Sequence, residues 1–156
     1  MGLQTMQIDP ALNIPPTDET WGNIESDPDI SSIKDMYFGK TNEELTALLE
    51  RNYIVRCLDL GAMPDDVFMY YSIGFYKFIL DRVSDDERFG VFLGSFLDAI
   101  SCKRENSLSV WRKFWMKSGS LLMQFSDRLN SSQMDEMTKL ELMEEISEIR
   151  TEMLQP

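Results

Sequence analysis

Two of the side chains most often used in catalysis, histidine and cysteine, are absent or rare in this chain. Its 156 residues include no histidine, so the usual general base, proton shuttle and metal ligand is missing. The two cysteines, Cys57 and Cys102, lie among apolar residues of expected helices. We expect both to be buried, reduced thiols, since no histidine can activate them as nucleophiles. The sequence therefore argues against an enzyme, and we expect no cofactor and no metal site.

Two further motifs suggest chemistry but are explained by helix ends. Gly39-Lys40-Thr41 resembles the end of a phosphate-binding loop, yet that loop needs a glycine where Lys34 stands. Gly39 is better explained as the end of one helix, and Thr41 as the start of the next. The paired acids Asp65-Asp66 and Asp85-Asp86 could act in acid–base catalysis. Both pairs fall in expected first helical turns, where the helix dipole favours negative charge.

Acidic charge is concentrated at the two ends of the chain. The formal net charge is −12, and residues 1–36 contribute −6, residues 130–156 contribute −5 and residues 37–129 only −1. Acidic surfaces attract basic partners and speed their encounter. The alternative is that these acids form ordinary solvated faces. The candidate partner-binding residues are Asp18, Glu19, Glu25, Asp27 and Asp29 near the N-terminus and Glu141, Glu144, Glu145, Glu148 and Glu152 on the last helix.

A basic and aromatic stretch at 111–117 interrupts this acidic pattern. Such interleaving can bind nucleic acid, but Trp111 and Trp115 have the spacing of core positions, and the overall negative charge weakens phosphate binding. We therefore expect no nucleic-acid binding. Arg112, Lys113 and Lys117 are a secondary candidate surface, which we expect to pack against the acidic last helix.

The coarse pattern of the chain is helical. Prolines at positions 10, 15 and 16 predict an extended, acidic arm over residues 1–26, and residues 27–156 predict a helical bundle domain. No segment alternates with period two for long enough to predict a strand. The expected fold is an all-α, single-domain bundle of about five long helices and one short helix, with the extended N-terminal arm outside it.

Individual helices are marked by caps and apolar stripes. Asp27-Pro28 and Gly39 bound the short helix. Capping boxes at 41–44 and 84–87 open two of the long helices, and Asp65 opens the central one, which is apolar nearly all round. The remaining two helices are predicted by heptad-like seams. These seams are Trp111, Trp115, Ser118, Leu122, Phe125 and Leu129 in one helix, and Leu142, Ile146, Ile149 and Met153 in the last.

Residues 37–80 resemble a known family. Tyr37-Phe38-Gly39-Lys40-Thr41-Asn42-Glu43-Glu44, followed by Asn52 and Phe68-Met69-Tyr70-Tyr71, is similar to the opening of a family of small, uncharacterised bacterial proteins with an F-x-G-K-T-x-E-E start. Gly61-Ala62-Met63-Pro64 departs from the Met-Gly step of that family. The resemblance implies a bacterial, stand-alone cytoplasmic protein and transfers no site residues.

These observations favour a non-catalytic protein that binds and inhibits another protein. We expect a bacterial immunity protein that neutralises a basic toxin domain through its acidic surfaces. Two alternatives remain: an adaptor or secretion chaperone that holds a partner segment, and a structural subunit that uses the arm as a clasp. The most apolar run, at 67–80, is too short to span a bilayer and contains Lys77, so we expect a cytoplasmic protein that binds no membrane. The oligomeric state is left open.

Overall fold

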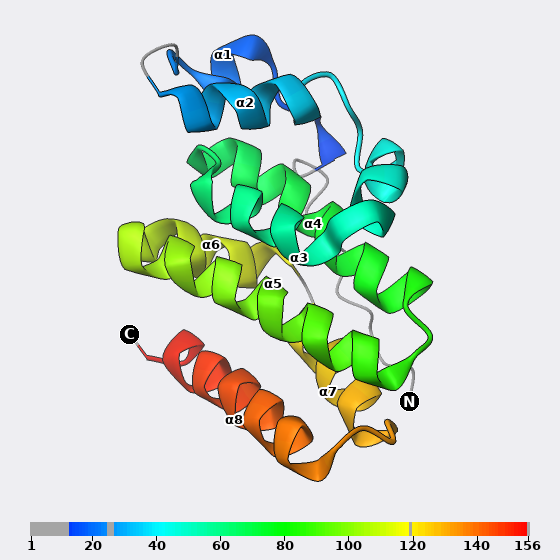
Figure 1. Cartoon of the computed structure of the whole chain (residues 1–156). Helices are drawn as coiled ribbons and strands as arrows, with labels where there is room; N and C mark the ends of the chain where they lie inside the picture. The colour runs from blue at the N-terminus through cyan, green and yellow to red at the C-terminus, as the bar shows by residue number, and fades with distance from the viewer. Residues whose placement is uncertain (1–12, 25–26, 119, 156) are drawn as a thin grey trace.

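The fold is an all-α bundle, as the sequence predicts. The computed structural model describes residues 13–24, 27–118 and 120–155, and within them it contains helices and no strand. The order is α1 (Asp18–Trp21), α2 (Pro28–Tyr37), the 3-10 helix η2 (Glu43–Leu45), α3 (Thr46–Ala62), α4 (Asp65–Arg82), α5 (Asp86–Asn106), α6 (Leu108–Lys117), α7 (Leu121–Asn130) and α8 (Glu136–Met153). Figure 1 shows α1 and α2 at one end of a stack of helices and α8 at the other.

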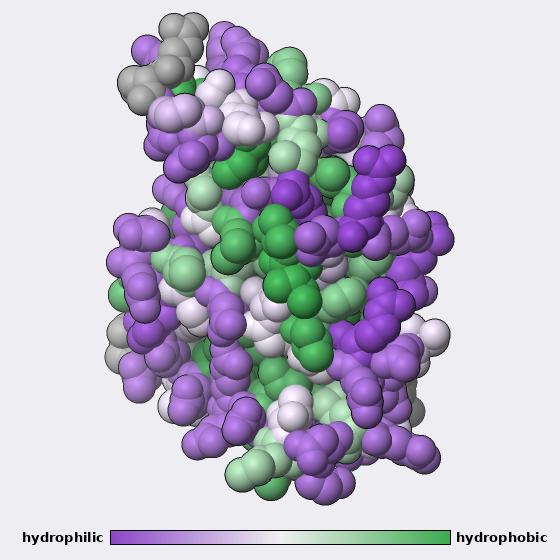
Figure 2. All heavy atoms as spheres, viewed as in Figure 1, coloured by the Kyte–Doolittle hydropathy of each residue, from purple (hydrophilic) through white to green (hydrophobic). Residues whose placement is uncertain are grey.

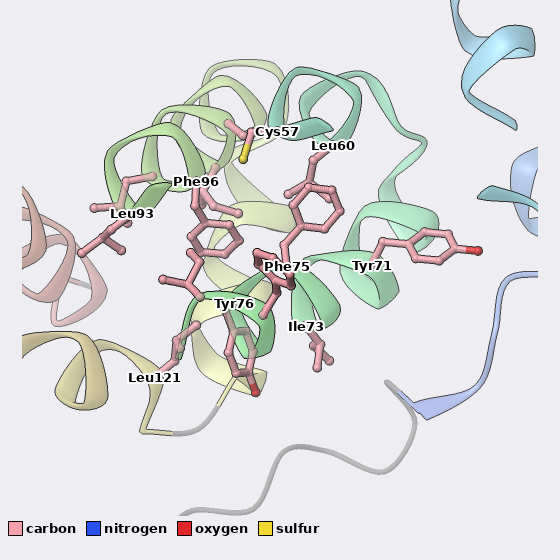
Figure 3. Packing of buried hydrophobic residues seen from close by; sticks show 14 of the residues in the cluster. Cys57, Leu60, Tyr71, Ile73, Phe75, Tyr76, Leu93, Phe96 and Leu121 are labelled. Atoms are coloured by element: carbon pink, nitrogen blue, oxygen red, sulfur yellow. The ribbon is translucent and has the colours of Figure 1, made fainter. Parts of the chain in front are cut away.

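The centre of the bundle is α4, which is buried on nearly every side. Phe68, Tyr71 and Phe75 are fully enclosed, and Figure 3 shows Phe75 among side chains from neighbouring helices, including Leu60 and Phe96. Ring pairs extend this packing, with Tyr53 and Phe75 centroids 5.6 Å apart. Burial of so many large aromatic side chains is the main stabilising contribution to this fold.

A buried lysine ties three helices together. Lys103 on α5 is 6% exposed, and its Nζ donates to the carbonyl of Met63, 2.7 Å away, and to the carboxylate of Asp65, 3.1 Å away. Met63 lies in the turn between α3 and α4, and Asp65 is the first residue of α4. A buried charge is tolerated only when it is paired and hydrogen-bonded, so this lysine fixes the turn against α5.

The N-terminal arm is not extended throughout. Residues 18–21 form α1, capped by Thr17, and Trp21 at its end is only 1% exposed. The helix packs against α4, because the buried indole contributes far more free energy than the short helix could supply by itself. The remainder of the predicted arm, 1–12 and 25–26, lies outside the described residues.

Of the two predicted capping boxes, the one at 41–44 is present, whereas at 84–87 the cap is one residue later than predicted. At 41–44 the box is present, but it opens η2, and α3 follows from Thr46. At 84–87 the cap is Asp85, whose carboxylate accepts from the N–H of Arg88 at 2.8 Å. The predicted Ser84 does not cap because it lies one residue too early, and its carbonyl accepts from Arg128 instead.

The long helix predicted across 111–129 is wrong, because it is broken into α6 and α7. Ser118 ends α6, and its hydroxyl donates to the carbonyl of Trp115 at 3.1 Å. At the break one apolar position differs, since Leu121 is fully buried where the heptad pattern predicted Leu122, while Phe125 and Leu129 are buried as predicted. A serine that bonds to its own backbone competes with helix continuation. The bundle therefore has more and shorter helices than predicted.

Candidate protein-binding surface

The acids of the N-terminal end serve the helices of their own chain. Asp27 caps α2, its carboxylate accepting from the N–H groups of Asp29 and Ile30 at 3.0 and 3.2 Å. Asp18 forms an ion pair with Lys34 of α2. Glu19 and Asp29 lie in the first turns of α1 and α2, where the helix dipole favours them.

Of the ten predicted partner-binding acids, Glu25 falls outside the described residues. The other predicted acids near the N-terminus support helix ends or, in the case of Asp18, pair with Lys34.

The acids of the C-terminal end are arranged differently. Leu142, Ile146 and Ile149 of α8 are buried against the bundle, as predicted, and the glutamates lie on the remaining faces. Glu141, Glu144 and Glu148 are exposed, and they form no ion pair within the described part of the chain.

Glu152 is the exception among the α8 acids, because it pairs with Arg104 of α5 at 2.8 Å. Three of the predicted acids are therefore left facing solvent.

Glu145 lies between the exposed acids and the bundle. Partial burial raises the pKa of its carboxyl above the usual value, and the negative charges of Asp98 on α5 and of Glu148 raise it further. Neither Asp98 nor Glu145 has an ion-pair partner among the described residues. A positive charge placed here by another molecule would relieve this repulsion.

The prediction that the basic face of 112–117 packs against the acidic last helix is wrong for two of its three residues. Lys113 and Lys117 line a hollow with Pro16, Asp66 and other residues, between the N-terminal segment and α4. They point there because Trp111, Phe114 and Trp115 occupy the buried face of α6.

The third basic residue, Arg112, is half-buried, and its Nε has no hydrogen-bond partner among the described residues. Arg104 supplies the cation for α8 instead, with its guanidinium 5.6 Å from the Trp111 ring centre.

The structure contains an apolar groove that the sequence analysis missed. It has a volume of about 450 Å³ and lies between α3 and α5. Leu58 is 75% exposed and Ile54 45% exposed. Figure 2 shows apolar side chains gathered in a band down the middle of this face, with polar side chains on both sides. The lining residues are Ile54, Cys57, Leu58, Gly61 and Ala62 of α3 and Ser95, Asp98, Ala99 and Cys102 of α5.

The signal for this groove was present in the sequence. The buried stripe of α3 runs through Leu49, Tyr53, Cys57 and Leu60, so Ile54 and Leu58 are apolar residues outside the stripe. Such residues on an exposed helix face mark a candidate binding surface once they gather into a patch. Whether they gather depends on what α5 places beside them, which the sequence pattern did not indicate.

The two cysteines differ in environment. Cys57 is buried, and burial raises the pKa of its thiol to about 12, so it stays protonated at neutral pH. Cys102 is exposed, so the prediction of two buried thiols is wrong for this residue. It lines the open groove from the α5 side.

Comparisons with known proteins give no relative: no protein-family model matches the chain, and neither a curated protein nor a solved structure does. The resemblance at 37–80 therefore remains a prediction. No helix in the described residues combines the length and the apolar character that crossing a membrane requires.

Proposed function

We propose that this chain is a non-catalytic protein that binds a basic partner protein through the outer face of α8, in the manner of an immunity protein that neutralises a toxin domain. The supporting observation is the state of Glu141, Glu144 and Glu148. They are exposed on one helix and form no ion pair within the described residues, whereas Asp18 and Asp27 are engaged by their own chain.

The physical basis of this proposal is electrostatic complementarity. A net charge of −12 raises the rate of encounter with a cationic protein. Three neighbouring carboxylates on a helix that is anchored by Leu142, Ile146 and Ile149 present that charge on a fixed scaffold. A rigid surface loses less conformational entropy on binding than a flexible tail does.

The test compares two variants that change the charge equally. The partner is first isolated by cross-linking in the cell of origin. Its affinity is then measured for the wild type, for Glu141→Gln/Glu144→Gln/Glu148→Gln, and for the matched control Asp35→Asn/Glu50→Gln/Asp127→Asn, which neutralises three exposed acids on α2, α3 and α7. We expect the α8 variant to bind about tenfold more weakly, since each exposed pair contributes about 0–1 kcal/mol.

Salt dependence gives the second readout. The affinity of the wild type should fall between about 50 mM and about 300 mM salt, and this fall should be shallower for the α8 variant. Equal losses in both variants would show that net charge alone matters. An unchanged affinity in the α8 variant would remove this face from the interaction.

A second candidate function, an adaptor that holds a segment of its partner, is favoured by the groove between α3 and α5. Leu58 and Ile54 expose apolar surface there, and the volume of about 450 Å³ falls in the range of ligand-holding clefts. The two functions are compatible, since the groove and α8 lie on either side of α5.

A further inference from the structure

The groove between α3 and α5 is a candidate docking site for another helix. Its lining includes Gly61, Ala62, Ser95 and Ala99. Small side chains let the backbone of a neighbouring helix approach closely, at the interaxial distance of about 8–10 Å found between packed helices. The segment from Ile54 to Ala62 is about 12 Å long at 1.5 Å per residue, which matches roughly two turns of an occupant.

Exposed apolar side chains lie on both of the helices that form this groove. Leu58 and Ile54 project from α3. On α5, Val91 is 54% exposed, and it shares a helix face with Ser95, Asp98 and Cys102 at a 4-3-4 spacing. An amphipathic helix would bury these side chains with residues at positions i, i+4 and i+7.

Charge on the margins of the groove selects among such helices. Asp98 belongs to the groove, and Glu145 of α8 lies close enough to act on both Asp98 and Glu148. None of the three has an ion-pair partner among the described residues. Near the start of the two helices, exposed charges of both signs lie side by side, Arg51 next to Glu50 and Arg88 next to Glu87.

We propose that this groove holds an amphipathic helix of a partner protein, apolar on the face that it buries and carrying Lys or Arg along the edge next to Asp98 and Glu145. The proposal rests on the proposed function, because it specifies which part of the basic partner is bound.

The probe is a display library of 18-residue helical peptides, each with an apolar face and with flanking positions randomised between Lys and Glu. Selection on the full chain should enrich Lys on one flank, and the selected peptides should bind Leu58→Ser at least about tenfold more weakly, as expected for a central apolar anchor. Leu140→Ser is the matched control, because Leu140 is 66% exposed on α8 outside the groove lining.

Cys102 reports the location of binding directly. Cys57 is buried and its thiol stays protonated, so a maleimide reacts mainly with Cys102 in the groove. A bound peptide should slow this reaction in proportion to its occupancy. The substitution Asp98→Lys should reverse the preferred flank from Lys to Glu.

Each result supports or overturns the proposal. No enrichment of any peptide, selection of Glu flanks by the wild type, or binding that leaves Cys102 reactive would overturn it. If the peptides bind the α8 glutamine variant more weakly but bind Leu58→Ser as tightly as the wild type, the groove is not their binding site. The proposed function would still stand in that case. If neither Leu58→Ser nor the α8 glutamine variant loses affinity for the partner protein, both the groove proposal and the proposed function are overturned.

Discussion

The two acid-rich ends of the chain use their carboxylates in different ways. At the N-terminal end, Asp27 caps α2 and Asp18 pairs with Lys34. At the C-terminal end, Glu141 and Glu144 face solvent with no ion pair in the described part of the chain. Equal charge in the sequence therefore does not mean equal availability to a partner.

The same contrast holds for apolar surface. On what we call the covered side, α1 and the segment 41–45 lie against α4. On the open side, which comprises the groove between α3 and α5 and the outer face of α8, Leu58 remains exposed. The covered side is expected to be sensitive to mutation for reasons of stability, and the open side for reasons of binding.

The largest expected effect is on the covered side, at Trp21. Trp21→Ala removes a side chain that is 1% exposed, and the cost should be about 3–5 kcal/mol in the free energy of unfolding. Urea denaturation measures it. Ile14→Ala, at a residue 68% exposed in the same segment, should change stability by less than about 0.5 kcal/mol. Similar small changes in both variants would show that α1 does not anchor the segment.

The next prediction compares a glycine on the covered side with a glycine on the open side. A Cβ at Gly74 of α4 would lie 2.8 Å from Cγ of Asn42, which is held by hydrogen bonds to Tyr70 at 3.0 and 3.1 Å. Gly74→Ala should therefore cost about 1–3 kcal/mol.

The matched substitution is Gly61→Ala on the open side. Its Cβ would meet Cys102 at 3.7 Å, an ordinary contact, so this variant should be neutral or up to about 1 kcal/mol more stable. Thermal unfolding of the two variants tests the contrast. A destabilised Gly61→Ala would mean that the groove is more tightly packed than its lining indicates.

Removing one acid from each end gives a smaller effect. Asp27→Ala deletes the cap of α2 and should cost about 1 kcal/mol, whereas Glu144→Ala should stay within about 0.5 kcal/mol. Chemical denaturation at one pH measures both. The comparison fails if the two substitutions cost the same.

The smallest effect is a pH dependence at Glu145. Because the pKa of this carboxyl is raised in the folded state, the native protein binds the proton more tightly than the unfolded chain, and the ionised form is destabilising at neutral pH. Glu145→Gln should raise the melting temperature at pH 7 by no more than about 2–4 °C.

This gain should shrink as the pH falls through the folded-state pKa, where the wild type regains its proton. Glu141→Gln, at an exposed glutamate of the same helix, is the control and should show no such trend. A gain that does not vary with pH would contradict the assigned cause.

Much of the fold could be predicted from local sequence signals. The caps at Asp27 and Thr41 and the buried seam through Leu142, Ile146 and Ile149 lie where the sequence placed them. The prediction failed where two local signals competed. At Ser118 the heptad spacing favoured one helix, but the hydroxyl of this residue donates to the carbonyl of Trp115 where α6 ends, and Leu121 is buried in place of Leu122.

The candidate surface was predicted only in part. The glutamates of α8 were found from their spacing, because a helix with a buried seam through Leu142 and Ile146 must expose its other faces. The groove was not found, because Leu58 and Asp98 lie far apart in the sequence. The position of Lys113 beside the N-terminal segment was also not predicted, because it depends on where that segment packs.

By itself the sequence determined the helical class, helix caps such as Asp27, and the positions of acid and apolar residues, because each follows from interactions within a few residues along the chain. The tertiary structure alone decided which of those residues remain available. Asp18 is neutralised by Lys34, Glu152 is taken by Arg104, and Leu58 is left beside α5 without a cover among the described residues. These outcomes depend on contacts between distant segments, which no local pattern specifies.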